Sequence, residues 1–539
     1  MTKRLMIIRI RCVPGLGLLL MLASAGLAGA GAGRDAPLAD AAQRGDKLAV
    51  LSLLEKHPDV NAPQSDGATA LHWAAYLSDA ETTALLLRAG ANVNVRNDLG
   101  VTPLALAAQQ GGVSVIEQFV KAGAAPNDPV NFVNAGETPL MHAARSGSVG
   151  AVKLLVKAGA DANAKEAWNG QTALMWAAAA AHAPVVEALL EIGADVHARS
   201  NAGTTPFMFA VRKGDIRSVQ AMLAAGAGVN EKRPDLATPL LVAIINGYED
   251  LVDLLLDKGA DPNAEGGSTE LTVHGMRARP QKIELKTPSF REQLRDVGSE
   301  GGNRRNNSLG RPLQAAVHVA NWHISDEFIS SNIDRLRVIK SLVAHGADVN
   351  GRNTDMEPRW SGARYRRRLV GATAFLFAAK AADVEAMRLL LRLGADPKIN
   401  TGVNITPLMA AAGIAWASNQ DQAGEEQVLE AVRLLVEELG ADVTFVADTG
   451  ETAMHAAAYR GANKVVQYLF DKGAKLDVAD KIGRTPLTVA EGVEYGNSFA
   501  AQPQTAELLR KLGAKEIPCP KLCLNMIPEE TLPPEGVTR

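Results

Sequence analysis

The chain has 539 residues, a formal net charge of −3 and only 4% aromatic residues. A net charge this close to zero gives no support to nucleic-acid binding through the charge of the whole chain. The length ordinarily indicates several domains, but the small and aliphatic residues that dominate here also suit a long array of closely stacked helices without a single core.

Residues 1–32 have the pattern of a secretory signal peptide. Basic residues between positions 3 and 11 precede a largely apolar stretch, residues 13–27, and small residues at 28–32 provide two cleavage motifs. An uncleaved membrane anchor is the alternative interpretation, which the crowding of small residues disfavours. We therefore expect an exported protein, periplasmic or secreted, that does not span a membrane once the signal is removed.

From residue 33 onward, a unit of about 33 residues recurs along most of the chain. Each copy begins with a Thr, usually followed by Pro or Ala and an apolar residue, because a Thr hydroxyl caps a helix and Pro fits its first turn. These residues are Thr69, Thr102, Thr138, Thr172, Thr205, Thr238, Thr373, Thr406, Thr452 and Thr485.

A second apolar helix then ends at a glycine, which adopts the left-handed conformation at little cost. These glycines are Gly90, Gly123, Gly159, Gly193, Gly226, Gly259, Gly346, Gly394, Gly440, Gly473 and Gly513. One such unit cannot bury its own apolar face, so the pattern predicts a stack of helix–turn–helix units.

The unit resembles the ankyrin repeat, whose signature is T-P-L-H-x-A-A followed by G-A-D-x-N. Residues 69–75 read TALHWAA and residues 159–163 read GADAN. The resemblance covers about residues 36–515. It implies an all-α solenoid of about twelve units with short β-turn or hairpin loops, with repeats at 33–264, further repeats with insertions at 311–514, and an irregular tail at 515–539. It also implies a non-enzymatic scaffold that binds a protein partner through loop tips and the concave helix face.

The resemblance places partner-binding positions on the loop tips before each Thr and at the ends of the first helices. In this chain they are Asp66, Tyr76, Asp98, Gln109, Arg145, Trp168, Arg212, Lys213, Ile245, Tyr459 and Arg460. Trp168 is the strongest candidate, because nothing in its loop would obviously bury it and exposed aromatics are favoured interface anchors.

Other aromatic and imidazole side chains have plainer interpretations. Trp73, Trp176 and Phe209 are expected to pack between units rather than line a ligand groove. The resemblance implies that His72 and His455 hydrogen-bond the backbone of a neighbouring turn, so we interpret neither as a metal ligand nor as a catalytic base.

The repeat rhythm is interrupted by a basic, Gly- and Asn-containing insertion at residues 265–310, and a second arginine-rich segment follows at 351–370. Together they offer an alternative function, the binding of an envelope polyanion or glycan at 265–370; a solvated loop is the competing interpretation. The expected export argues against nucleic acid. The candidate basic patch consists of Arg277, Arg279, Arg304, Arg305, Arg364, Arg366, Arg367 and Arg368.

The tail at residues 515–539 contains Cys519 and Cys523, which could form a local disulfide in an oxidising compartment. A catalytic redox pair is less favoured, because the spacing is not C-x-x-C. No Walker phosphate loop, H-E-x-x-H or nucleophile-elbow motif is found in the sequence. We therefore expect no enzymatic activity, no cofactor and no metal site.

Overall fold

The computed structural model describes residues 36–129, 136–232, 238–264, 311–320, 334–353, 369–414, 423–495 and 498–517. The signal segment, the insertion at 265–310, the whole candidate basic patch and the Cys519–Cys523 pair lie outside these ranges. The chain divides into two compact units, residues 1–161 and 162–539. Within the described residues, the helices form twelve consecutive pairs, four in the first unit and eight in the second.

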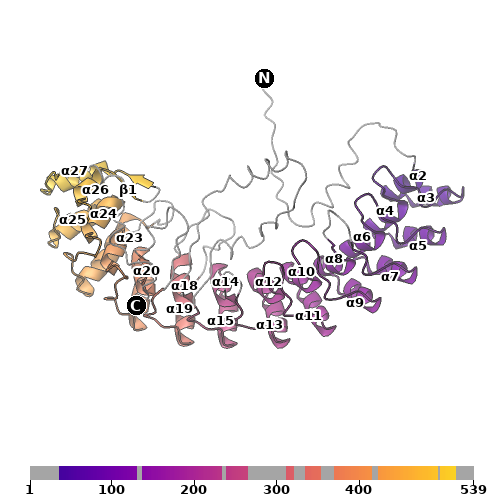
Figure 1. Ribbon diagram of the computed structural model, residues 1–539, viewed down its shortest axis with the longest axis horizontal. Coiled ribbons are helices and arrows are strands. Elements are labelled where there is room, and N and C mark those ends of the chain that lie inside the picture. The colour runs from indigo at the N-terminus through magenta and orange to yellow at the C-terminus, as the bar shows by residue number, and fades with distance from the viewer. Residues whose placement is uncertain are drawn as a thin grey trace, which may run out of the picture. The chain divides into compact units, whose positions relative to one another are not determined.

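In the first unit, the first helices of successive pairs contact one another, and the second helices form a parallel row (Figure 1). The first helices are α2 (Pro37–Gln43), α4 (Ala70–Tyr76), α6 (Pro103–Gln110) and α8 (Pro139–Ser146). The second helices are α3 (Lys47–Leu54), α5 (Ala80–Arg88), α7 (Val113–Lys121) and α9 (Val149–Lys157).

The second unit repeats this arrangement. Its first helices are α10 (Ala173–Ala179), α12 (Pro206–Lys213), α14 (Pro239–Ile245), α18 (Pro312–Ala320), α20 (Ala374–Lys380), α22 (Pro407–Ala412), α24 (Ala453–Arg460) and α26 (Pro486–Glu491). Its second helices are α11 (Ala183–Glu191), α13 (Ile216–Ala224), α15 (Glu249–Asp257), α19 (Arg335–Ala344), α21 (Val384–Arg392), α23 (Glu425–Arg433), α25 (Asn463–Asp471) and α27 (Pro503–Lys511).

Two short elements depart from the helix-pair pattern in the second unit. A π-helical segment, η2 (Leu434–Glu438), continues α23. Strands β1 (Val493–Tyr495) and β2 (Ser498–Ala500) pair antiparallel, with Val493 opposite Ala500, between α26 and α27. The described residues therefore confirm a helical repeat solenoid that carries one small hairpin.

The structure confirms the predicted threonine caps at the start of the first helices and the predicted glycines after the second helices. The Thr102 hydroxyl accepts a hydrogen bond from the Ala105 amide at 3.3 Å, and the same cap is made at Thr138, Thr172, Thr205, Thr238, Thr373, Thr406, Thr452 and Thr485. All eleven glycines predicted to follow a second helix have positive φ, between +68° and +98°. A β-carbon would be strained in that conformation, which explains why glycine recurs there.

Asparagine side chains join consecutive units through their loops. Asn230 donates to the Gly259 carbonyl at 2.9 Å and accepts from the Asp261 amide at 2.7 Å. Asn94 does the same in the first unit with the carbonyl of Gly123 and the amide of Ala125. Each asparagine thus satisfies a carbonyl left open at the end of the next second helix, which fixes the stacking of neighbouring units.

The first helices supply the core through small residues and one recurring polar contact. The His72 Nε2 lies 3.0 Å from the Val101 carbonyl, and the His455 Nε2 lies 3.0 Å from the Arg484 carbonyl, as expected for these positions. Gln314 replaces the histidine in α18 and donates to the Gly351 and Ala372 carbonyls at 3.0 and 2.9 Å.

Trp73, Trp176 and Phe209 are buried. This burial confirms that they pack in the core instead of lining a groove.

Candidate partner-binding surface

In the described ranges, several of the loops that precede the first helices are short hairpins joined by hydrogen bonds. In a typical loop the Ser200 amide donates to the Thr204 carbonyl at 3.0 Å, four residues on. Neighbouring loops are also joined, because the Asn201 amide donates to the Asn169 carbonyl at 2.7 Å. The tips of these two loops are therefore held in register by a backbone hydrogen bond.

The loop that carries Trp168 is one residue longer than the typical loop. Here the Glu166 amide donates to the Gln171 carbonyl at 3.0 Å, five residues on. The Glu166 carboxylate is buried and accepts from the amides of Trp168 at 2.7 Å, Asn169 at 2.8 Å and Gln171 at 2.9 Å. One buried carboxylate therefore accepts hydrogen bonds from three amides of the loop and fixes its backbone.

The neighbouring loop, which contains Asn201, also hydrogen-bonds to this segment. The Asn201 amide group donates to the Trp168 carbonyl at 3.0 Å. Gly170 has a φ of +65°, which favours glycine. A β-carbon at this position would lie 2.5 Å from the Asn201 Oδ1, so any other residue would displace the Asn201 side chain. Despite this tight backbone, the Trp168 side chain is 57% exposed. The loop presents a large aromatic side chain to solvent on a fixed backbone.

The other predicted partner-binding residues differ in exposure. In the first unit Asp98 is exposed, while Asp66, Tyr76, Gln109 and Arg145 are half-buried. In the second unit Lys213 is exposed, while Arg212 and Arg460 are half-buried. No contact in the described residues tests whether any of them binds a partner, so each remains a prediction.

Two of these positions need correction. The side chain of Ile245 is fully buried at 0% exposure, and that of Tyr459 is 4% exposed. Both lie in the last turn of a first helix whose neighbours pack against it, α18 against α14 and α22 and α26 against α24. An apolar or aromatic side chain at this position is removed from water by turning into that contact, so neither offers an accessible surface.

Comparison with known proteins agrees with this geometry. A sequence profile described as "Ankyrin repeats (3 copies)" matches residues 38–130, 124–200, 192–265 and 421–514, which together exceed half of the chain. The chain belongs to the ankyrin repeat family. Ankyrin repeats indicate a protein–protein interaction scaffold, and the fold is typically a non-catalytic module.

Individual relatives of this ankyrin-repeat chain match it over short stretches. Neurogenic locus notch homolog protein 1 of Xenopus tropicalis is 41% identical over 71 residues, 13% of this chain and 3% of that protein. Protein PhlB of Serratia liquefaciens is 45% identical over 76 residues, 14% of this chain and 34% of that protein. The matches thus span about a third of PhlB and a small part of the notch homolog.

A solved structure, the human ASB11 ankyrin repeat domain, is 24% identical and covers 41% of this chain and 97% of that chain, with a TM-score of 0.38.

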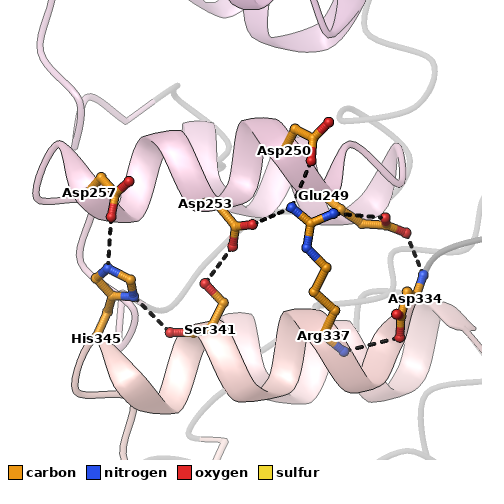
Figure 2. Close-up of polar contacts among 8 residues, drawn as sticks. All are labelled: Glu249, Asp250, Asp253, Asp257, Asp334, Arg337, Ser341 and His345. Carbon is orange, nitrogen blue, oxygen red and sulfur yellow. Dashed lines mark hydrogen bonds and ion pairs between the residues drawn. The ribbon is translucent and has the colours of Figure 1, made fainter.

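A polar seam between two ankyrin repeats was not predicted from the sequence. It joins α15 to α19, the second helices of the repeats before and after the insertion at 265–310 (Figure 2). Arg337 donates to Asp250 at 2.7 Å and to Asp253 at 2.6 Å, and the Ser341 hydroxyl donates to Asp253 at 2.6 Å. The side-chain bonds to Asp250 and Asp253 raise the pKa of the Arg337 guanidinium further above its usual range.

The seam continues to the other end of the two helices. His345 Nε2 lies 3.2 Å from Asp257 Oδ1, and its Nδ1 lies 2.8 Å from the Ser341 carbonyl. The Ser341 carbonyl and the Asp257 carboxylate raise the pKa of His345. The signal in the sequence was the helical spacing of two sets, acidic at 250, 253 and 257 and complementary at 337, 341 and 345, but only the stack brings them together.

The described residues contain no group of three His, Cys, Asp or Glu side chains that could hold a metal ion. None of the helices in the described ranges is long and apolar enough to cross a membrane.

Proposed function

We propose that this ankyrin-repeat chain is an exported, non-enzymatic scaffold that binds a protein partner through the loop tips and first-helix ends of its second unit, with Trp168 as the central anchor. The observation that carries the proposal is the exposed indole of Trp168 on a loop held by Glu166 and Asn201.

A fixed aromatic anchor favours binding for two physical reasons. The indole buries a large apolar area when a partner covers it, and tryptophan is enriched among the residues that dominate interface energetics. Because the loop backbone is already ordered, little conformational entropy is lost when the partner docks. An exposed tryptophan on a flexible loop would lose part of this advantage.

The experiment is site-specific photo-crosslinking in the full chain. A photoreactive phenylalanine replaces Ala167, an exposed neighbour whose substitution leaves Trp168 in place, and a control variant carries it at Gln220, an exposed residue of the second helix α13. We expect a discrete adduct with a protein from an envelope extract at position 167 and none at position 220. Equal labelling at both positions, or none at 167, would refute binding at this loop.

The alternative function, binding of an anionic envelope polymer, depends on residues 265–370. All eight residues of the candidate basic patch lie outside the described ranges, so the geometry of the patch adds nothing to this alternative. A chain lacking residues 266–309 separates the two functions. The scaffold proposal expects the adduct at position 167 to survive the deletion, whereas polymer binding would be lost.

A further inference from the structure

Three successive loops of the second unit carry a basic residue at the same position. Lys165, Arg199 and Lys232 each lie six residues after the glycine that ends the preceding second helix, and all three are exposed. The first two are in direct contact, because the Lys165 ammonium donates to the Arg199 carbonyl at 2.9 Å. The Arg199 guanidinium in turn donates to the Gly203 carbonyl at 3.0 Å. These bonds hold two of the charges at the loop edge without neutralising them.

The acidic residues beside these cations only partly offset them. Glu166 is buried, and its oxygens accept from the loop amides. Glu231 is half-buried and bonded to the Thr205 hydroxyl, and burial raises the pKa of its carboxyl group. Asp161 and Asp195 are exposed, and the Asp195 Oδ1 accepts from the His197 amide at 2.8 Å. In the described residues of these loops, solvent therefore meets three cations and two exposed carboxylates.

The cations and the aromatic anchor occupy one edge. Trp168 lies three residues after Lys165 in the same loop, and the Asn201–Asn169 and Asn201–Trp168 bonds join that loop to the one that follows Arg199. The chain as a whole has a net charge of −3, so this basic edge is a local departure from its overall balance.

We propose that this edge, defined by Lys165, Trp168, Arg199 and Lys232, binds an extended acidic segment of a partner protein that places an apolar or aromatic residue on the indole. The inference rests on the proposed function and specifies the chemistry of the partner. An extended chain that runs along the stack meets one cation in each repeat, because the three basic residues recur once per unit. Carboxylates complement the cations, and the apolar residue buries the exposed face of Trp168.

The test uses a random dodecapeptide library displayed on phage and selected on the full chain. We expect the enriched peptides to be rich in Asp and Glu and to contain at least one aromatic, aliphatic or proline residue. The best peptide, made synthetically with a fluorophore, should bind about tenfold more weakly to Trp168→Ala and to the double variant Lys165→Glu, Arg199→Glu. Its affinity should also fall as salt rises from 0.05 to about 0.5 M, since exposed charges are then screened.

Val446→Ala is the matched control, because Val446 is an exposed apolar residue in a distant loop of the same unit. It should bind the peptide as the unsubstituted chain does, and the melting temperatures of all variants should agree. Enrichment of neutral or basic peptides, no enrichment, or equal binding by Trp168→Ala would overturn the inference. So would equal binding of an acidic peptide without any apolar residue, which would indicate a general polyanion surface.

The two proposals fail separately. If photo-crosslinking at position 167 yields a partner while the selected peptides are not acidic, the scaffold function stands and the acidic-segment inference is wrong. If position 167 gives no adduct and no peptide is enriched, both are wrong.

Discussion

The Asn263 side chain donates to the Gly346 carbonyl at 2.9 Å, although 83 residues separate the two in the sequence. Asn263 also accepts from the Asp348 amide at 2.7 Å. The equivalent bonds of Asn230 span 29 and 31 residues and have the same lengths to within 0.1 Å. The repeats on either side of the insertion are therefore stacked as ordinary neighbours.

Deletion of residues 266–309 should leave the second unit folded. The contacts of α14 with α18 and of α15 with α19 are already made, and closing a shorter loop costs less entropy, by roughly 0.6 kcal/mol for each halving of its length. We expect the melting temperature, followed by circular dichroism, to stay the same or rise slightly. A marked fall, or a broad transition, would show that the deleted residues contribute to the stack.

Replacement of Arg337 by Gln tests the seam between α15 and α19. The variant keeps a hydrogen-bond donor but removes the charge that Asp250 and Asp253 share. Because all three groups meet solvent, we expect a small fall in melting temperature at 0.02 M salt that shrinks toward zero at 1 M, where the Debye length is about 3 Å. The control is Arg510→Gln, which removes an exposed ion pair with Glu491 outside the seam. A salt-independent loss would mean that Arg337 acts through packing instead.

Replacement of His72 by Gln should reduce the acid sensitivity of the first unit. Burial lowers the pKa of the His72 imidazole to about 4, against about 6.5 in an unfolded chain. As the pH falls from about 6.5 to about 4, the unfolded chain takes up this proton while the folded chain does not. The free energy of unfolding then decreases by up to about 1.4 kcal/mol per pH unit, and this loss ends below the folded pKa.

Glutamine can replace the histidine at this position, as Gln314 does in α18. Gln314 accepts from the Arg311 amide at 3.0 Å and donates to the Gly351 carbonyl. The measurement is urea unfolding of the full chain and of His72→Gln at pH 8, 7, 5.5 and 4.5, with hydrogen exchange in α4 to localise the effect. The difference in free energy of unfolding between His72→Gln and the unsubstituted chain should be constant between pH 7 and 8. Below pH 6.5 it should shift in favour of the variant. Parallel pH profiles would contradict a buried neutral imidazole.

Replacement of Glu166 by Ala should loosen the loop that presents Trp168. The variant leaves the amides of Trp168, Asn169 and Gln171 without their shared acceptor. Loss of a buried charged acceptor costs on the order of 1–3 kcal/mol, so these amides should exchange with deuterium at least about tenfold faster. Glu191→Ala, which removes an exposed carboxylate of the same repeat, should leave them unchanged. Unchanged exchange in Glu166→Ala would show that the Asn201 contacts alone hold the loop.

The features that could be predicted from the sequence were those set within one repeat. The Thr caps, the left-handed glycines and the His72 contact recur with fixed local geometry, so their spacing identified them. The exposure of Trp168 followed from its place in a loop, but the role of Glu166 did not, because the described short loops such as 97–101 and 200–204 lack the extra residue found between Glu166 and Gln171.

Features that depend on the approach of two repeats could not be predicted in this way. Ile245 and Tyr459 occupy positions that the repeat pattern leaves open, yet each is covered by a neighbouring first helix. The partners in the seam are 84 to 88 residues apart, so only the stack shows that Arg337 faces Asp253 and that His345 faces Asp257.

The repeats before and after residues 265–310 are held together by contacts that do not involve the peptide backbone between them. Helices α14 and α15 are held to α18 and α19 by side-chain packing, by the asparagine bonds of Asn263 and by the seam, none of which requires an intact backbone at 265–310. A single protease cut there would yield two fragments that remain associated and migrate together until denatured. The same site would also accept new chain termini, so the protein could be produced as two separately encoded halves that reassemble.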